Sequence, residues 1–484
     1  MHKKHKKLLT HDSTCNIDEA IQVFPFALLT LAKLMHFTYP RLMHKLKYGA
    51  QVAFISLLWG ITFQDKHINP TGIASKLGKI SHDRLQRLRK NSFLTATVIM
   101  LELLQQAIEL MTTTPHSQTM LILDDVLIPK PYARFIQGAY WDHDHALDIP
   151  CFGIRVVVLL WSNGSLAIPV AFLVWHKHQD PMPSFAPRRY RSKNELARIL
   201  VYWVYRKGLR FHVLTFDSWY AKDENLILFN RLGIVWVTAL APNRWVRLPL
   251  ATPRKNPRGK PTTHDRLRCN DLAARYPTRD HYSNYPALGL RARAFFADLT
   301  TKVPKLKLVI VKDYVEKLIL VDEANPKRKK KDPNRYLLTN HLYATVAWVI
   351  CCYKSRYEIE WAFREAKQHL ALGACSATKF NAVTQHISLS FLGFASLQQL
   401  HANLPCEVKN GLTLGGCRGL LQQLYRVRTG ESVHLVNLSE KCESVDIVLN
   451  DILPNAENSA KSDKSLDNTT IHKDLSYLDL SFAA

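Results

Sequence analysis

Residues Tyr353–Lys367, YKSRYEIEWAFREAK, hold the most informative pattern in the sequence. Four side chains capable of chemistry stand at offsets of 0, 3, 7 and 14 from the first of them: Tyr353, Arg356, Glu360 and Lys367. In a helix, which turns by about 100° per residue, these positions fall within an arc of about 60°. An apolar stripe lies beside them, made of Ile359, Phe363, Ala366 and Leu370. The stretch therefore predicts part of a long helix, from about Leu342 to Leu372, that packs on a core and presents one acid among cations.

This set of side chains is suited to phosphoryl transfer. Two carboxylates together with a substrate phosphate bind Mg²⁺ well, and a third carboxylate allows a second metal ion. Arg356 and Lys367 would hold phosphates of a cut strand, and Tyr353 could donate a hydrogen bond there. The alternative is a surface ridge whose charges pair along the helix.

The sequence from Met120 onward is typical of a sheet with flanking helices. It predicts strands at Met120–Leu123, Phe152–Trp161, Leu166–Trp175, Phe211–Phe216 and Ile234–Leu240, and helices at Lys193–Tyr205 and Asn225–Leu232. Asn163-Gly164, between the second and third strands, is a strong hairpin signal. The first three strands can form an antiparallel meander, and the later strands join through helical crossovers. This order resembles the RNase H-like fold, an α/β fold with a mixed sheet.

Acidic residues directly follow two of these strands. Asp217 follows the fourth strand, where its alternative role is that of a helix N-cap. Asp124 and Asp125 follow the first strand. Successive strand residues point to opposite faces, so only one of this pair can face a metal ion directly.

The spacing Y-x2-R-x3-E-x6-K is similar to the signature of a large group of bacterial insertion-sequence transposases of the DDE superfamily. The flanking residues 336–340, YLLTN, resemble the same family. The resemblance covers roughly Met120–Leu372. It implies an RNase H-like core whose two aspartates and one glutamate bind Mg²⁺, with Mn²⁺ as a substitute. It also favours Asp124 over Asp125, because members often carry Asp-x-Thr after the first strand, although this chain has Val126 in place of the threonine.

The resemblance and the local composition together predict six regions. They are a helical DNA-binding domain at 1–115, the first part of the RNase H-like core at 116–241, a β-rich insertion subdomain at 242–340, the last core helix at 341–375, a helical C-terminal region at 376–454, and a tail at 455–484. The tail is rich in Ser, Asn and Asp, a composition typical of disorder.

Residues Thr71–Arg89, TGIASKLGKISHDRLQRLR, predict a helix-turn-helix within the first region. Gly78 permits a tight turn, and Ser81 can cap the second helix. The side chains expected to meet DNA are Ser81, His82, Arg84 and Arg87. The alternative is a surface helical hairpin in a bundle.

The charge balance favours a polyanionic partner. The chain has 484 residues, 65 Lys+Arg against 40 Asp+Glu, and a formal net charge of +25. Phosphate contacts supply most non-specific nucleic-acid binding energy, so DNA is the leading partner and a ribosome-associated or membrane-surface protein is the alternative. Basic loops at Pro253–Pro261 and Lys327–Lys331, and the cations Arg188, Arg189, Arg191 and Lys193, are candidates for phosphate contacts.

Other features indicate a cytoplasmic protein that does not cross a membrane. The nine cysteines form no CxxC pair, which favours reduced thiols. The longest apolar runs, Val52–Phe63 and Tyr343–Tyr353, are too short to span a bilayer. The cluster Trp141–His145, WDHDH, is interpreted as a polar loop rather than a metal site.

Taken with the resemblance, these features predict a cut-and-paste DNA transposase. Its partners would be double-stranded DNA, as terminal inverted repeats and as target, and the family implies a homodimer on DNA. Two alternatives stay open. One is a DNA-binding repressor of the same fold that has lost catalysis, and the other is an RNase H-like nuclease that cuts without strand transfer.

Overall fold

A computed structural model describes residues 26–63, 69–78, 80–88, 91–131, 133, 135–144, 148–177, 190–255, 259–312, 334–402 and 412–419. These residues divide into two compact units. One holds the residues up to Glu102, His369–Ser376 and those from Gln385 onward. The other holds Leu103–Gln368 and Ala377–Thr384. The predicted tail at 455–484 and the basic loop Lys327–Lys331 lie outside the described residues.

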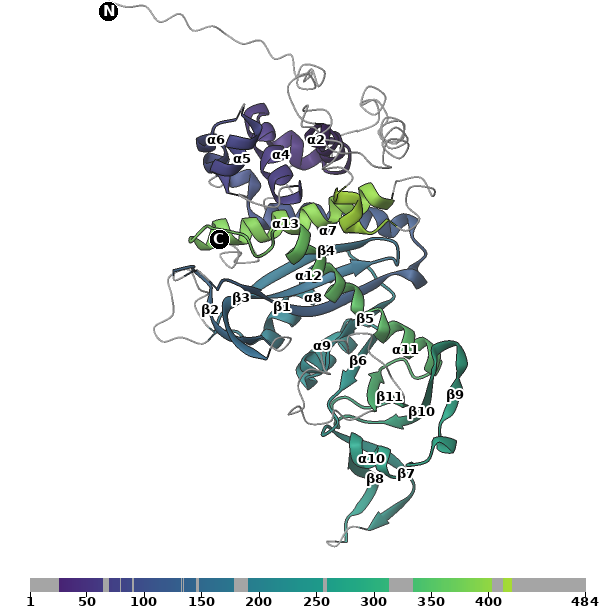
Figure 1. Cartoon of the computed structure of the whole chain (residues 1–484). Helices are drawn as coiled ribbons and strands as arrows, with labels where there is room; N and C mark the ends of the chain where they lie inside the picture. The colour runs from purple at the N-terminus through teal and green to yellow at the C-terminus, as the bar shows by residue number, and fades with distance from the viewer. Residues whose placement is uncertain are drawn as a thin grey trace, which may run out of the picture. The chain divides into compact units, whose positions relative to one another are not determined.

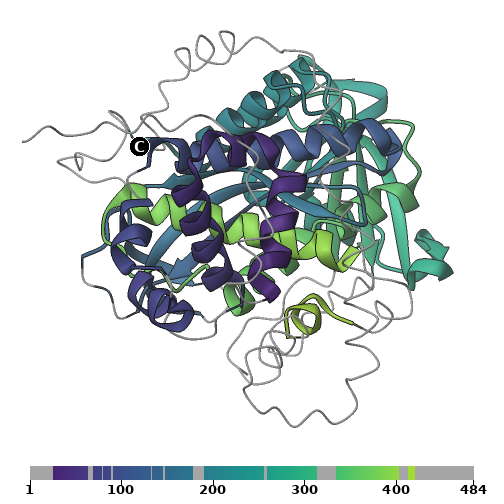
Figure 2. The same cartoon turned by 90° about the horizontal axis from the view of Figure 1, so that it is seen from above.

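The first unit is helical. Its elements are α2 (Phe26–Thr38), α3 (Pro40–Lys45), α4 (Tyr48–Phe63), α5 (Pro70–Leu77), α6 (His82–Leu88), η1 (Ser92–Leu94), the start of α7 (Ala96–Thr113) and most of α13 (Phe380–Ala402). The hydroxyl of Thr38 donates to Gln399 at 3.1 Å and joins α2 to α13. Figure 2 shows α13, in light green, crossing the purple N-terminal helices. The N-terminal helices and the helix after the core thus form one unit, whereas the sequence predicted two separate regions for them.

The predicted helix-turn-helix segment folds as two short helices joined by a left-handed turn. Gly78 has φ of +67°, a conformation that glycine adopts without strain. The Oγ of Ser81 accepts a hydrogen bond from the Arg84 backbone N–H at 3.3 Å, which confirms the predicted cap. Ile73 of α5 and Leu85 of α6 are fully buried. The side chains expected to meet DNA are all exposed: Ser81, His82, Arg84 and Arg87.

The second unit is built on a mixed sheet that has ten strands among the described residues (Figure 1). The order is β2-β3-β1-β5-β6-β12-β11-β10-β9, and β4 also pairs with β3. The strands are β1 (Met120–Pro129), β2 (Tyr140–Asp144), β3 (Ile149–Ser162), β4 (Ala167–Trp175), β5 (Val213–Phe216), β6 (Trp236–Leu240), β9 (Ser283–Tyr285), β10 (Leu290–Ala297), β11 (Leu306–Lys312) and β12 (Arg335–Thr339).

The topology matches the predicted RNase H-like arrangement. β1, β3 and β4 form the expected antiparallel meander, and β1–β5 and β5–β6 are parallel pairs. α8 (Lys193–Arg206) and α9 (Asp223–Arg231) form the helical crossovers. Asn163 supports the hairpin turn, because its Oδ1 accepts from the Leu166 N–H at 2.8 Å. The central strands are apolar on both faces because helices cover both sides.

The region 242–340 is rich in strands, but most of it extends the core sheet. β12 pairs antiparallel with β6, and β11, β10 and β9 follow in turn. Only β7 (Trp245–Lys255) and β8 (Pro261–Arg268) form a sheet apart from the core among the described strands. α10 (Cys269–Ala274) follows this hairpin. The insertion therefore widens the core sheet, whereas the sequence predicted a separate subdomain.

Three local predictions were wrong. β1 continues through Asp124 and Asp125 to Pro129, because β3 pairs with it over the whole length. The WDHDH cluster is not a loop but strand β2, which pairs with β3, while its last residue, His145, lies outside the described residues. The long helix is two helices, α11 (Val346–Lys354) and α12 (Tyr357–His369), separated by Ser355 and Arg356.

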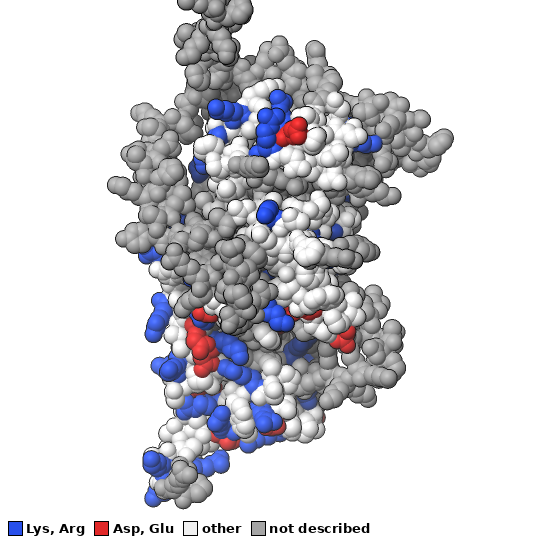
Figure 3. Space-filling model, turned by 90° about the vertical axis from the view of Figure 1, so that its left-hand side faces the viewer, with Lys and Arg blue, Asp and Glu red and all other residues white. Residues whose placement is uncertain are grey.

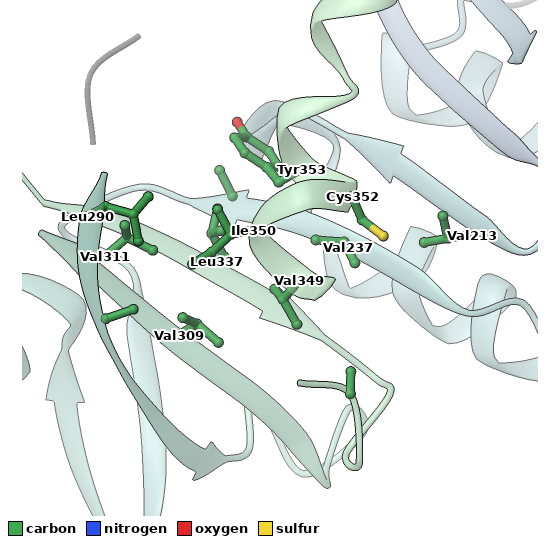
Figure 4. Close-up of a cluster of buried hydrophobic side chains, with 13 residues drawn as sticks. Val213, Val237, Leu290, Val309, Val311, Leu337, Val349, Ile350, Cys352 and Tyr353 are labelled. Atoms are coloured by element: carbon green, nitrogen blue, oxygen red, sulfur yellow. The ribbon is translucent and has the colours of Figure 1, made fainter. Parts of the chain in front are cut away.

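α11 packs on one face of the sheet through a buried apolar cluster (Figure 4). Val349, Ile350 and Tyr353 of α11 contact side chains from core and insertion strands alike. The strand members of the cluster are Val213, Val237, Ala239, Leu290, Ala292, Val309, Val311 and Leu337. Among the described helices, none combines the length and apolar content that a membrane crossing needs.

Substitutions at two glycines of α4 test how this helix packs against α5. A Cβ at Gly60 would overlap the buried side chain of Ile73, whereas a Cβ at Gly49 meets open space. We expect Gly60→Ala to lower the free energy of unfolding by about 1–2 kcal/mol through overpacking. Gly49→Ala should raise it by up to about 1 kcal/mol, because alanine favours a helix more than glycine does. Urea unfolding followed by circular dichroism measures both, and equal effects would contradict the α4–α5 packing.

Candidate active site

Two acids are brought together by the pairing of β1 with β5. These strands are parallel, and their last paired residues are Leu123 and Phe216. Asp124 and Asp217 follow them, so they are neighbours in the same register and on the same face. Asp217 precedes the short helix η3 (Ser218–Tyr220), and its carboxylate makes no capping hydrogen bond to that helix. The N-cap alternative for Asp217 is therefore not supported.

Helix α12 brings a third acid to this place through Arg356. The guanidinium of Arg356 donates to Asp124 Oδ2 at 2.8 Å and lies 2.5 Å from Glu360 Oε1. The side chains of Arg356, Asp124 and Glu360 are 13%, 18% and 30% exposed, so the cluster opens to solvent at the glutamate. One cation thus bridges acids from β1 and α12.

The surrounding charges and burial shift the pKa values of Asp124 and Arg356. Burial raises the pKa of Asp124 to about 7, with further upward contributions from Asp125 and Asp217, while Arg356 and the Asp125 backbone N–H oppose the rise. Burial alone would lower the pKa of Arg356. The charges around it, among them Asp124, Glu360 and Asp217, nevertheless hold that pKa above its ordinary value. Arg356 therefore stays charged and compensates the cluster.

Asp125 lies on the opposite face of β1, among different partners. Its carboxylate accepts hydrogen bonds from Arg155 at 2.7 Å, from Lys193 at 3.2 Å and from the Tyr220 hydroxyl at 2.8 Å. Its side chain is 9% exposed. Of the two candidates in β1, Asp124 is the one that shares a face with Glu360.

Of the remaining residues of the Tyr-Arg-Glu-Lys set, Lys367 shares α12 and its face with Glu360, whereas Tyr353 does not. Tyr353 belongs to α11, is 3% exposed and forms part of the apolar cluster in Figure 4. The Arg356 guanidinium carbon lies 5.7 Å from the centre of its ring. Lys367 interacts electrostatically with Asp144 of β2 and Cys151 of β3, two turns beyond Glu360. The break between α11 and α12 is the reason that Tyr353 does not lie on the predicted common arc.

Sequence reasoning did not identify the partners of Asp125. Lys193 was expected to contact phosphate, yet it bonds to Asp125. Arg155 also pairs with Asp142, and although burial would raise the pKa of Asp142, these bonds hold it below its ordinary value. A signal for this network was present, because Arg155 is a lone charge within the apolar run FGIRVVVLLW and a buried charge requires a partner.

The carboxylates of Asp124, Asp217 and Glu360 are suitable ligands for a divalent cation, although they are not grouped around a common point. Within the described residues, no three His, Cys, Asp or Glu side chains are grouped closely enough to hold a metal ion. Asp124 and Glu360 share a guanidinium instead. Carboxylates are the hard oxygen donors that Mg²⁺ and Mn²⁺ prefer. A metal ion would therefore bind here only if Arg356 released one or both acids.

Comparison with known families gives two matches. A family described as DDE superfamily endonuclease matches residues 56–290, which include Asp124 and Asp217. A family described as transposase DDE domain matches residues 193–393, which include Asp217 and Glu360. No curated protein matches the sequence. Together with the RNase H-like fold, the two matches support a transposase or endonuclease of the DDE superfamily, a class that acts on DNA and generally uses divalent metals.

The raised pKa of Asp124 predicts a pH dependence of stability in the metal-free protein. The pKa is about 7 in the folded state against 3.8 for an ordinary aspartate. Between these two pH values the folded state binds one more proton than the unfolded state. The contribution of Asp124 to the free energy of unfolding is therefore fully present below about pH 4 and is lost as the pH rises through about 7. Asp124→Asn should remove this part of the pH profile. Urea unfolding in EDTA from pH 4 to 8 tests it, and parallel wild-type and variant profiles would refute it.

A second prediction concerns Arg356 as the cation of the cluster. Without metal, Arg356→Gln should lower the free energy of unfolding by roughly 3 kcal/mol, which is the lower limit of the usual cost of breaking a buried ion pair. Added Mn²⁺ should raise the melting temperature more in this variant than in the wild type, because no guanidinium must be displaced.

Arg364→Gln is the matched control for this experiment. Arg364 is exposed on the same helix and its side chain bonds to the Tyr357 hydroxyl instead of an acid. Equal Mn²⁺ shifts in the wild type and in the Arg356 variant would show that Arg356 does not compete with metal.

Proposed function

We propose that this chain is a DNA transposase of the bacterial insertion-sequence type with the Tyr-Arg-Glu-Lys signature. It cuts DNA at the ends of its element and transfers the cut strands into target DNA. The observation that carries the proposal is the bridge from Asp124 through Arg356 to Glu360. Residues 232 positions apart in the sequence meet there, beside Asp217, in a fold of the expected class.

The three acids on this face are the proposed metal ligands. Asp124 offers a carboxylate from within β1, Asp217 offers one from the residue after the adjacent strand β5, and Glu360 offers one from α12. Mg²⁺, or Mn²⁺ in its place, supplies the activation of the attacking water and the neutralisation of charge on the phosphate oxygens. Asp125 is excluded from the ligand set because its carboxylate is occupied by Arg155, Lys193 and Tyr220.

Arg356 has two roles in this proposal. In the absence of metal it neutralises Asp124 and Glu360. When metal ions take its place, its guanidinium is free to hold a phosphate of the DNA end, for which its fork of donors is suited. Tyr353 supports Arg356 with its ring, and Lys367 holds the strand two turns farther along α12.

The β7–β8 hairpin is proposed as a further DNA contact. It is mostly exposed and carries Arg247, Arg254, Lys255, Arg266 and Arg268. Arg266 and Arg268 lie 4.7 and 5.2 Å from the ring centre of Trp245, which is 40% exposed. Figure 3 shows basic side chains gathered at the lower end of the molecule, at the height of this hairpin. Such a surface suits a DNA backbone.

The segment α5–α6 is proposed to bind the terminal inverted repeats. Its second helix exposes His82, Arg84 and Arg87, and Ser81 stands at the start of that helix. Side chains at the start of a recognition helix are those that reach base edges. Two chains are proposed to act as a homodimer that holds both ends, in the cytoplasm where bacterial DNA lies.

The proposal predicts that Glu360→Gln abolishes cutting and leaves DNA binding intact, because the amide keeps the shape but lacks the charge that holds metal. The substrate is a DNA carrying the inverted repeats that flank the gene, with Mg²⁺. Glu358→Gln is the control, since Glu358 lies on the same helix turn and interacts with Ser162.

Three results would separate the alternatives. Cutting by Glu360→Gln at the wild-type rate would contradict the proposed role of Glu360 as a metal ligand. Tight binding by the wild type without any cutting would favour the repressor, and cutting without joined products would favour the nuclease.

A further inference from the structure

The second acid of β1 is the centre of a nearly buried network. The donors to Asp125 come from three other elements, since Arg155 lies on β3, Lys193 on α8 and Tyr220 on η3. Both carboxylate oxygens are used, because Lys193 is 3.2 Å from each of them. A carboxylate so fully bonded has little capacity left for a ligand or a substrate.

Tyr220 connects this network to the turn that carries Asp217. Its backbone N–H donates to the Asp217 carbonyl at 3.0 Å, and its side chain is fully buried. The phenol hydroxyl donates a hydrogen bond to the Asp125 carboxylate. One hydrogen bond of 2.8 Å therefore joins the turn of Asp217 to the strand of Asp124.

Helix α8 is also linked to this turn, through Asn225 of α9. The side chain of Asn225 donates to the Tyr220 carbonyl at 2.9 Å and to Asn194 Oδ1 at 2.8 Å. Arg198 donates to Asn225 Oδ1 at 2.8 Å. Asn225 is fully buried. Thus α8 is linked both to Asp125, through Lys193, and to the turn after β5.

The turn requires such support because the acids repel each other. The pairing of β1 with β5 ends at Leu123 and Phe216, so no ladder hydrogen bond between the two strands fixes Asp217. Asp124 and Asp217 directly follow the last paired residues of adjacent strands, and like charges so placed repel each other. Repulsion would separate them if the turn could move.

We propose that Tyr220 and Asp125 are positioning residues, whose hydrogen bond fixes the spacing of the Asp124 and Asp217 carboxylates. The inference rests on the proposed role of those two acids in binding metal. Groups that orient metal ligands without touching the ion typically change metal affinity by tenfold or more when they are removed.

The test is Tyr220→Phe in the full chain. Calorimetry without DNA should give an Mn²⁺ affinity roughly tenfold weaker than in the wild type. In the cleavage assay, the metal concentration for half-maximal rate should rise by the same factor, while the rate at saturating metal stays near the wild-type value. A merely structural defect would lower that saturating rate as well.

Tyr282→Phe is the matched control. Tyr282 is 5% exposed, and its hydroxyl has no hydrogen-bond partner within the described residues. It should bind Mn²⁺ as the wild type does. If Tyr220→Phe proves unfolded by circular dichroism, Asn225→Ala releases the same turn without touching Asp125 and must weaken Mn²⁺ binding too.

The outcomes separate this inference from the proposed function. Wild-type Mn²⁺ affinity in the folded Tyr220 variant overturns the positioning role alone. Absence of Mn²⁺ binding in the wild type, or unchanged binding in Asp124→Asn, overturns the metal site itself and with it the proposed function.

Discussion

The mutual repulsion of three carboxylates, and its neutralisation by Arg356, is the constraint on which the site depends. Charges removed from water interact strongly, so acids within β1, directly after β5 and on α12 cannot stay close without a cation. Arg356 supplies it from the break between α11 and α12, where its N–H bonds to the Tyr353 carbonyl. The interruption of the helix and the ion pairs are thus parts of one arrangement.

The alternation of side chains along β1 divides two functions between adjacent acids. Asp124 points to the face of α12, where its partner is Arg356. Asp125 points to the face of α8, where its partners are fixed by burial. Successive side chains of a strand point to opposite faces of the sheet, so two adjacent carboxylates can lie in different environments.

Local sequence patterns predicted most core elements, and they singled out Asp124, Asp217 and Glu360 as candidates, because apolar runs and the acids beside them are visible among neighbouring residues. They predicted neither the broken helix nor strand β2, and not the partners of Asp125. The partners of Asp125 and of Arg356 are joined by hydrogen bonds and ion pairs between residues 30, 68, 95 and 232 positions apart, which no local pattern encodes. Asp142 illustrates the point, because its bond to Arg155 accompanies the pairing of a polar segment with β3.

The insertion has a structural role in delivering Glu360. β12 returns the chain to the edge of β6, and α11 begins seven residues after β12 ends. α11 then packs on core strands, through Val237, and on insertion strands, through Val309 and Leu337. Without the insertion strands, five of the eight strand residues in that apolar cluster would be absent. The position of α12, and therefore the distance from Glu360 to Asp124, depends on residues that take no part in the chemistry.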